Sequence, residues 1–92
     1  MSALEELLNI GSKSAAWLYA VGVYTRADIE RLGPAAVYQR VKDQGYKPSL
    51  NLLYALAGAV MDVRWNQLPD EVRGRLLLEL DALEDQRKRD QF

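Results

Sequence analysis

Side chains able to do chemistry are few in this sequence, because the chain contains no histidine and no cysteine. Histidine-dependent triads, imidazole acid-base catalysis, thiolate nucleophiles and the usual zinc sites are therefore excluded. The paired carboxylates are neighbours in the chain and point about 100° apart on a helix, too divergent to share a substrate. These pairs are Glu5/Glu6, Asp70/Glu71 and Glu84/Asp85. We expect a protein that is not an enzyme and needs no metal, cofactor or small-molecule substrate.

One short segment has residue types suited to binding a phosphate group. Residues 9–13 read Asn-Ile-Gly-Ser-Lys and resemble the turn of a helix-hairpin-helix motif, with Asn9 in place of the first glycine. In that motif, backbone amides and the positive end of the second helix hold a phosphate. The predicted nucleic-acid-binding residues are Ile10, Gly11, Ser12, Lys13 and Arg26. The alternative is that the hairpin only packs two helices.

The charge balance limits how nucleic acid or membrane could be bound. Twelve Lys and Arg against thirteen Asp and Glu give a net charge of −1, so any attraction to nucleic acid must be local. The start of the chain lacks the features of a signal peptide. The longest apolar stretch, residues 50–63, is too short to span a bilayer. We expect a cytoplasmic protein that does not bind membranes.

Helix start and stop signals divide the chain into short helices, without the alternation expected of strands. A capping-box pattern at Ser2 and Glu5 predicts the first helix, and the last begins at Pro69 with Val72, Leu76, Leu80 and Leu83 as its buried stripe. The predicted ranges are about 3–9, 12–21, 26–32, 34–44, 50–61 and 69–83. We predict an all-α domain over residues 1–84, a compact bundle of five to six short helices with a helix-hairpin-helix (SAM-like) element, and a frayed polar tail over 85–92.

Two features predict close packing around the apolar helix at 50–61. Gly58 costs about 1 kcal/mol relative to Ala inside a helix, so we expect another backbone to approach it closely. Trp65 and Asn66 predict a corner in which the indole covers the end of that helix. The Asn66 side chain is expected to bond backbone groups near Pro69.

Several of these segments together are similar to the TfoX C-terminal domain family. The similarity rests on Asn-Ile-Gly-Ser-Lys-Ser-Ala at 9–15, Leu-Tyr-Ala-Leu at 53–56 and Trp-Asn-Gln-Leu-Pro at 65–69, and it covers residues 5–80. The resemblance implies a helical domain of helix-hairpin-helix type, found in bacterial regulators of DNA uptake competence and as stand-alone proteins. Those regulators usually carry an N-terminal domain. Because this chain begins directly at Met1, we expect a stand-alone C-terminal domain.

Two functions remain open from the sequence. One is a regulatory domain that associates with DNA through weak, sequence-independent contacts of the hairpin with phosphates. The other is a protein-interaction module without direct contact to nucleic acid, favoured by the net charge of −1 and the apolar content. An aromatic side chain at the surface would indicate a partner site, because Trp and Tyr are enriched at binding hot spots.

Overall fold

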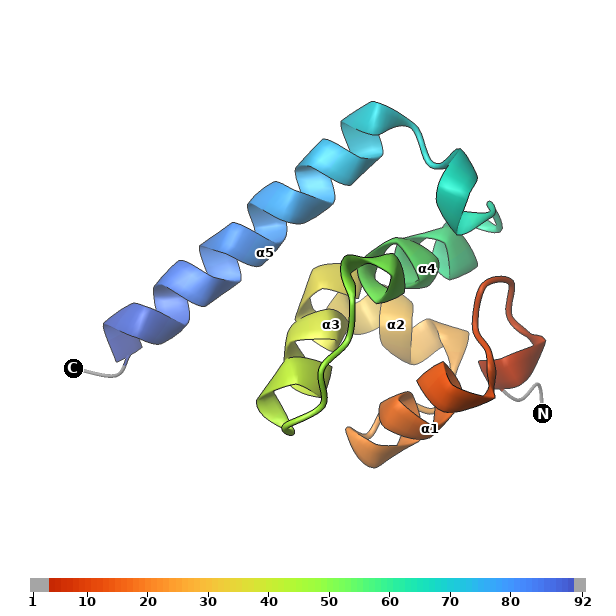
Figure 1. Cartoon of the computed structure of the whole chain (residues 1–92), viewed down its shortest axis with the longest axis horizontal. Helices are drawn as coiled ribbons and strands as arrows, with labels where there is room; N and C mark the ends of the chain where they lie inside the picture. Colours follow the sequence, from red (N-terminus) through yellow and green to blue (C-terminus); the bar gives the residue numbers. More distant parts are fainter. Residues whose placement is uncertain (1–3, 91–92) are drawn as a thin grey trace.

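The computed structural model describes residues 4–90, and over that range the chain is helical and contains no strand. The elements are η1 (Leu4–Glu6), α1 (Ser12–Ala20), α2 (Arg26–Leu32), α3 (Pro34–Asp43), α4 (Leu50–Met61), η2 (Trp65–Gln67) and α5 (Asp70–Asp90). Five α-helices and two short 3-10 turns thus form the fold (Figure 1). The predicted all-α class is confirmed.

Local signals set the ends of the middle helices. Thr25 begins α2 with a complete capping box, in which its hydroxyl accepts from the Asp28 amide at 3.2 Å and the Asp28 carboxylate accepts from the Thr25 amide at 3.2 Å. Pro34 is the first residue of α3, where its missing N–H costs no hydrogen bond. Both starts agree with the sequence prediction.

The predicted helix stops are also confirmed. Gly22, Gly33 and Gly45 have φ angles of 82°, 91° and 103°, a backbone region that residues with a Cβ rarely adopt. Each follows a helix end within two residues. The chain therefore turns sharply after α1, α2 and α3.

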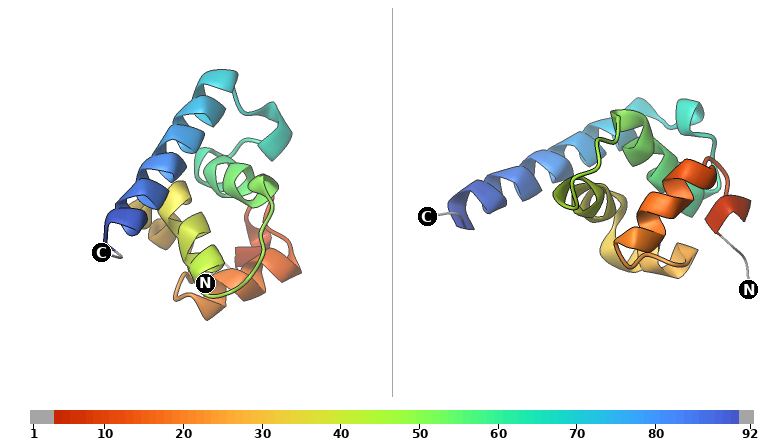
Figure 2. Two further views of the ribbon diagram at one scale, coloured as in Figure 1. Left: turned by 60° about the vertical axis from the view of Figure 1, so that its left-hand side comes forward. Right: turned by 60° about the horizontal axis from the view of Figure 1, so that its bottom comes forward.

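Helix α4 lies at the centre of the bundle. It packs against α2, α3, α5 and η2, and the views in Figure 2 show these elements around it. Seven of its residues are buried, which agrees with its nearly continuous apolar sequence. They are Leu52, Leu53, Ala55, Leu56, Ala57, Gly58 and Ala59. The prediction of a central helix is confirmed.

Helix α5 extends along one side of the bundle, against α3 and α4 (Figure 1). Leu76 and Leu80 are buried, and Val72 and Leu83 pack partly buried beside them, which confirms the predicted stripe. The helix does not fray after Leu83 but continues to Asp90. Its last turns consist mainly of strong helix formers, Glu, Gln, Lys and Arg, and Lys42 on α3 contacts Glu84 at 3.3 Å. The predicted loss of helix from residue 85 is therefore wrong.

The predicted helix over 3–9 is also wrong. Only Leu4–Glu6 form a 3-10 turn, and Asn9 has a left-handed backbone with a φ of 74° that ends any helix there. Leu4 is buried and anchors this segment to the core, while the Leu4 amide donates to the Tyr19 hydroxyl at 3.3 Å. Ser2 of the predicted capping box lies outside the described residues. The first arm of the expected hairpin is thus one short turn.

Candidate functional site

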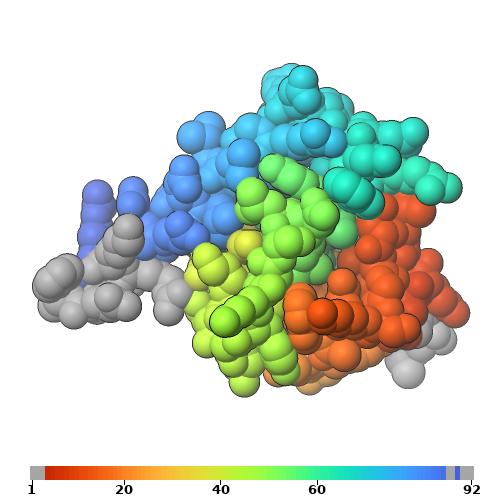
Figure 3. Space-filling model, in the orientation of Figure 1, coloured from red at the N-terminus to blue at the C-terminus, as the bar shows by residue number. Residues whose placement is uncertain are grey.

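A groove of about 450 Å³ lies between α1, the segment that leads into α4, and η2. Its polar and aromatic lining includes Asn9, Lys13, Trp17, Lys47, Ser49 and Trp65, and its apolar floor includes Leu52 and Ala55 of α4. In Figure 3, which shows this face, the orange residues of α1 lie beside the green segment entering α4, below the teal residues near η2. We call this the lysine groove.

The charge of the lysine groove is positive. Lys13 and Lys47 are the charged side chains that line it, and no Asp or Glu is among its lining residues. The Lys13 ammonium lies 5.2 Å from the centre of the Trp17 ring, a cation–π contact. Trp17 in turn stacks on Tyr46 with ring centres 5.4 Å apart. This stack ties α1 to the segment carrying Lys47 and so brings the two lysines to one groove.

Two helix starts lie at the edges of the groove. Gly11 precedes α1 and Ser49 precedes α4, and in neither helix does a side chain cap the first turn. The first amide of α1 with a carbonyl partner is that of Ala15, which donates to Gly11 at 2.9 Å. The amides before it are therefore left to solvent or a ligand, at the positive end of the helix. Both starts add positive potential to that of the lysines.

Asn9 connects the turn before α1 to the chain after α4. Its Nδ2 donates to the Val63 carbonyl at 2.9 Å, and its Oδ1 accepts from the Trp65 amide at 3.0 Å. Gly58 lies directly beneath: a Cβ there would overlap the Val63 carbonyl oxygen and lie 2.5 Å from the Asn9 Nδ2. The predicted close approach of another backbone to Gly58 is confirmed. We call this arrangement of Asn9, Gly58, Val63 and Trp65 the Asn9 bridge.

The predicted corner at Trp65 and Asn66 forms, but with different contacts. Trp65 begins η2 and lines the groove, and the residue is 40% exposed. Among the described hydrogen bonds none belongs to the Asn66 side chain; Asn9 holds the corner instead. The expected Asn66 bonds are therefore wrong, whereas the expected covering of the helix end by the indole stays a prediction.

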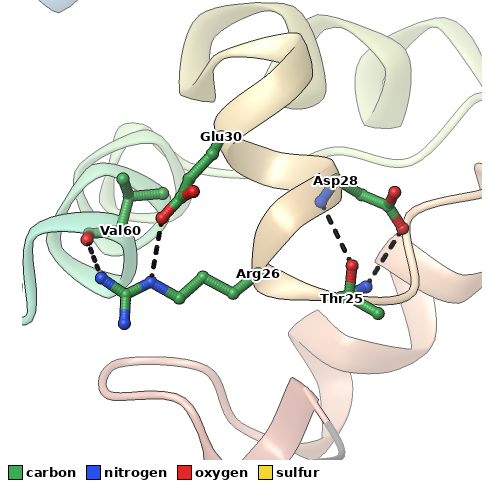
Figure 4. A network of polar contacts seen from close by, with 5 residues as sticks. All are labelled: Thr25, Arg26, Asp28, Glu30 and Val60. Atoms are coloured by element: carbon green, nitrogen blue, oxygen red, sulfur yellow. Dashed lines mark hydrogen bonds and ion pairs between the residues drawn. The ribbon is translucent and has the colours of Figure 1, made fainter.

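The structure separates the predicted site residues. Gly11, Ser12 and Lys13 are exposed at the start of α1, whereas the Ile10 side chain is buried and its amide donates to the Leu7 carbonyl at 3.2 Å. Arg26 does not line the groove: its guanidinium donates to the Val60 carbonyl near the end of α4 and pairs with Glu30 at 3.1 Å (Figure 4). Of the predicted residues Lys13 lines the groove, and its neighbours there, such as Lys47, were not predicted.

Asp28 is a residue of this region whose pKa departs clearly from its ordinary value. Its carboxylate accepts from the Tyr24 amide at 2.9 Å and from the Thr25 amide, and these hydrogen bonds lower the pKa of Asp28 below its ordinary value. Arg31, 3.6 Å away, acts in the same direction. The carboxylate is thus held ionised as a cap of α2 (Figure 4).

Among the side chains that the structure describes, no cluster of three or more His, Cys, Asp or Glu could hold a metal ion. None of the described helices is both long and apolar enough to cross a membrane.

The fold defines the class of protein as a small all-helical domain over the residues that the structure describes. The TfoX C-terminal domain family matches residues 1–80, and the chain belongs to this family, which is not known for catalysis. Comparison with curated proteins gives no match.

Two similar structures are crystal forms of proteins of unknown function from Listeria monocytogenes. The triclinic form has a TM-score of 0.80 and 29% identity, over 90% of this chain and 94% of that chain. The tetragonal form has a TM-score of 0.72 and 30% identity, over 90% of this chain and 98% of that one. The helical arrangement is therefore shared over nearly the whole domain.

Proposed function

We propose that this domain is a non-catalytic regulator that associates with nucleic acid through phosphate contacts in the lysine groove. The observation that carries the proposal is the convergence of Lys13 and Lys47 on a groove whose lining contains no carboxylate. In a chain of net charge −1, such a local positive surface favours an anionic ligand. The exposed amides of Gly11 and Ser12 add donors that suit a phosphate oxygen.

The contacts proposed here carry no base information. Lysine ammoniums and backbone amides bind phosphates, which position a protein without reading sequence. Binding is therefore weak and independent of sequence. More specifically, we propose that the domain takes part in DNA-associated regulation of the competence type in the cytoplasm.

Fluorescence anisotropy with a labelled random duplex at low salt tests the proposal. With two phosphates neutralised, the logarithm of the association constant falls with the logarithm of salt with a slope of about −2. Lys13→Glu and Lys47→Glu each abolish binding. Arg75→Glu is the matched control, because Arg75 is exposed on α5 and contacts Glu71 at 3.8 Å. Absence of binding to both the duplex and a single strand of the same length at about 100 µM protein, the weak end of non-specific affinities, contradicts the proposal.

A second candidate is a protein-interaction module that uses α5. Leu78 is 71% exposed and Leu77 36% exposed on the same helix, and exposed apolar side chains favour a protein partner. A pull-down from the native cell, with and without nuclease, separates the two functions. Partners retained after nuclease and lost in Leu78→Ser support the second candidate.

A further inference from the structure

Trp65 differs from the other aromatic side chain of the lysine groove. The Trp17 ring is already engaged, since it stacks on Tyr46 and lies against the Lys13 ammonium. Trp65 is 40% exposed, and its ring takes part in none of the ring stacks or cation–π contacts found among the described residues. Its ring is therefore partly exposed and, among the described residues, without an aromatic or cationic partner.

The position of Trp65 is fixed by the Asn9 bridge. The Trp65 amide donates to Asn9 Oδ1 at 3.0 Å, and the same Asn9 holds the Val63 carbonyl at 2.9 Å. Gly58 packs against this carbonyl, so the chain entering η2 is supported by the central helix. A backbone held in this way lowers the ordering cost of placing the indole when a ligand arrives.

We infer that the lysine groove binds single-stranded nucleic acid, with an unpaired base stacked on Trp65 and neighbouring phosphates facing Lys13 and Lys47. This inference rests on the proposed function and specifies its ligand. In a duplex the bases are stacked on each other, so their faces are closed to an indole. A single strand offers both base faces and phosphates, which match the combination of an exposed ring and two lysines in one groove.

The test compares a labelled oligothymidylate with a duplex of the same length, by fluorescence anisotropy at low salt on the full chain. The oligothymidylate binds at least about 5-fold more tightly, because stacking on one aromatic ring contributes roughly 5- to 150-fold in affinity. Trp65→Ala loses that advantage, and Trp65→Phe retains part of it. Tyr24→Ala, which removes a 57% exposed ring outside the groove lining, leaves the affinity unchanged.

A second measurement does not depend on the Ala variant folding. In a Trp17→Phe background the remaining fluorescence comes from Trp65, and oligothymidylate quenches it through stacking. Equal affinity for duplex and single strand, or an unquenched Trp65 signal at saturation, overturns the inference and leaves the proposed function standing. Failure of both oligonucleotides to bind overturns both.

Discussion

The Asn9 side chain donates to the carbonyl of Val63, 54 residues away in the chain, with an Nδ2–O distance of 2.9 Å. The same amide group accepts from Trp65, so one side chain joins the turn before α1 to the chain after the central helix. A left-handed φ of 74° at Asn9 aims the amide at this target. These contacts join the two segments that carry Asn9 and Trp65 to the wall of the lysine groove.

Asn9→Gly removes the two side-chain hydrogen bonds but keeps the backbone conformation, because glycine adopts the left-handed φ without strain. Loss of two hydrogen bonds of about 0.5–1.5 kcal/mol each lowers the free energy of unfolding by about 1–3 kcal/mol. Asn9→Ala costs about 1 kcal/mol more, since alanine is strained there. Urea denaturation measures both, and a Gly variant as stable as the parent contradicts the bridge.

Gly58→Ala destabilises the domain although alanine is the better helix former. Its Cβ would meet the Val63 carbonyl and the Asn9 amide, and such overpacking costs about 1–3 kcal/mol. Gly74→Ala in α5 is the matched control: a Cβ there has no neighbour within 4 Å. That variant gains up to about 1 kcal/mol. Thermal melts measure both variants, and a higher melting temperature for both would refute the close approach at Gly58.

Arg26→Ala tests whether this arginine supports the fold. Because the guanidinium binds the Val60 carbonyl near the end of α4, its removal lowers the free energy of unfolding by about 0.5–1 kcal/mol, the small value expected of an exposed site. Denaturant melts with Arg75→Ala as the reference measure this. Unchanged stability together with weaker nucleic-acid binding would instead place Arg26 in the interface.

The Asp28 cap makes stability depend on pH in acid. Because amide hydrogen bonds lower the pKa of Asp28 in the folded state, its contribution is complete above the ordinary value of about 3.9 and is lost as the pH falls through the lowered pKa. Asp28→Asn is therefore less stable than the parent at neutral pH, and the difference shrinks below about pH 4. Chemical denaturation at both pH values gives the comparison. A difference that does not vary with pH contradicts the role of the charge.

Helix ends were predictable from sequence because their causes are local. Thr25 and Asp28 are three residues apart, and Pro34 and Gly33 act on their own turn. The same rules failed where distant residues decide the structure. Residues 7–9 leave the helical path, and Asn9 there bonds to Val63 and Trp65.

Only some of the residues that line the groove could be predicted from the sequence. Lys13, which lines the groove, was a candidate from the sequence because its turn resembles a known motif. Lys47 has no local signal, and it joins Lys13 only because Tyr46 beside it stacks on Trp17. The exposure of Trp65 could not be predicted, since it depends on how η2 is held against Asn9.

The most direct test of the lysine groove as the nucleic-acid surface is a titration of the ¹⁵N-labelled domain with oligothymidylate, followed by NMR. We expect the largest chemical-shift changes at the amides of Gly11, Ser12 and Lys47 and at the Trp65 indole N–H, and none at Leu77 and Leu78 on α5. Saturating oligonucleotide that leaves the groove signals unmoved, or that moves only signals elsewhere, contradicts the account.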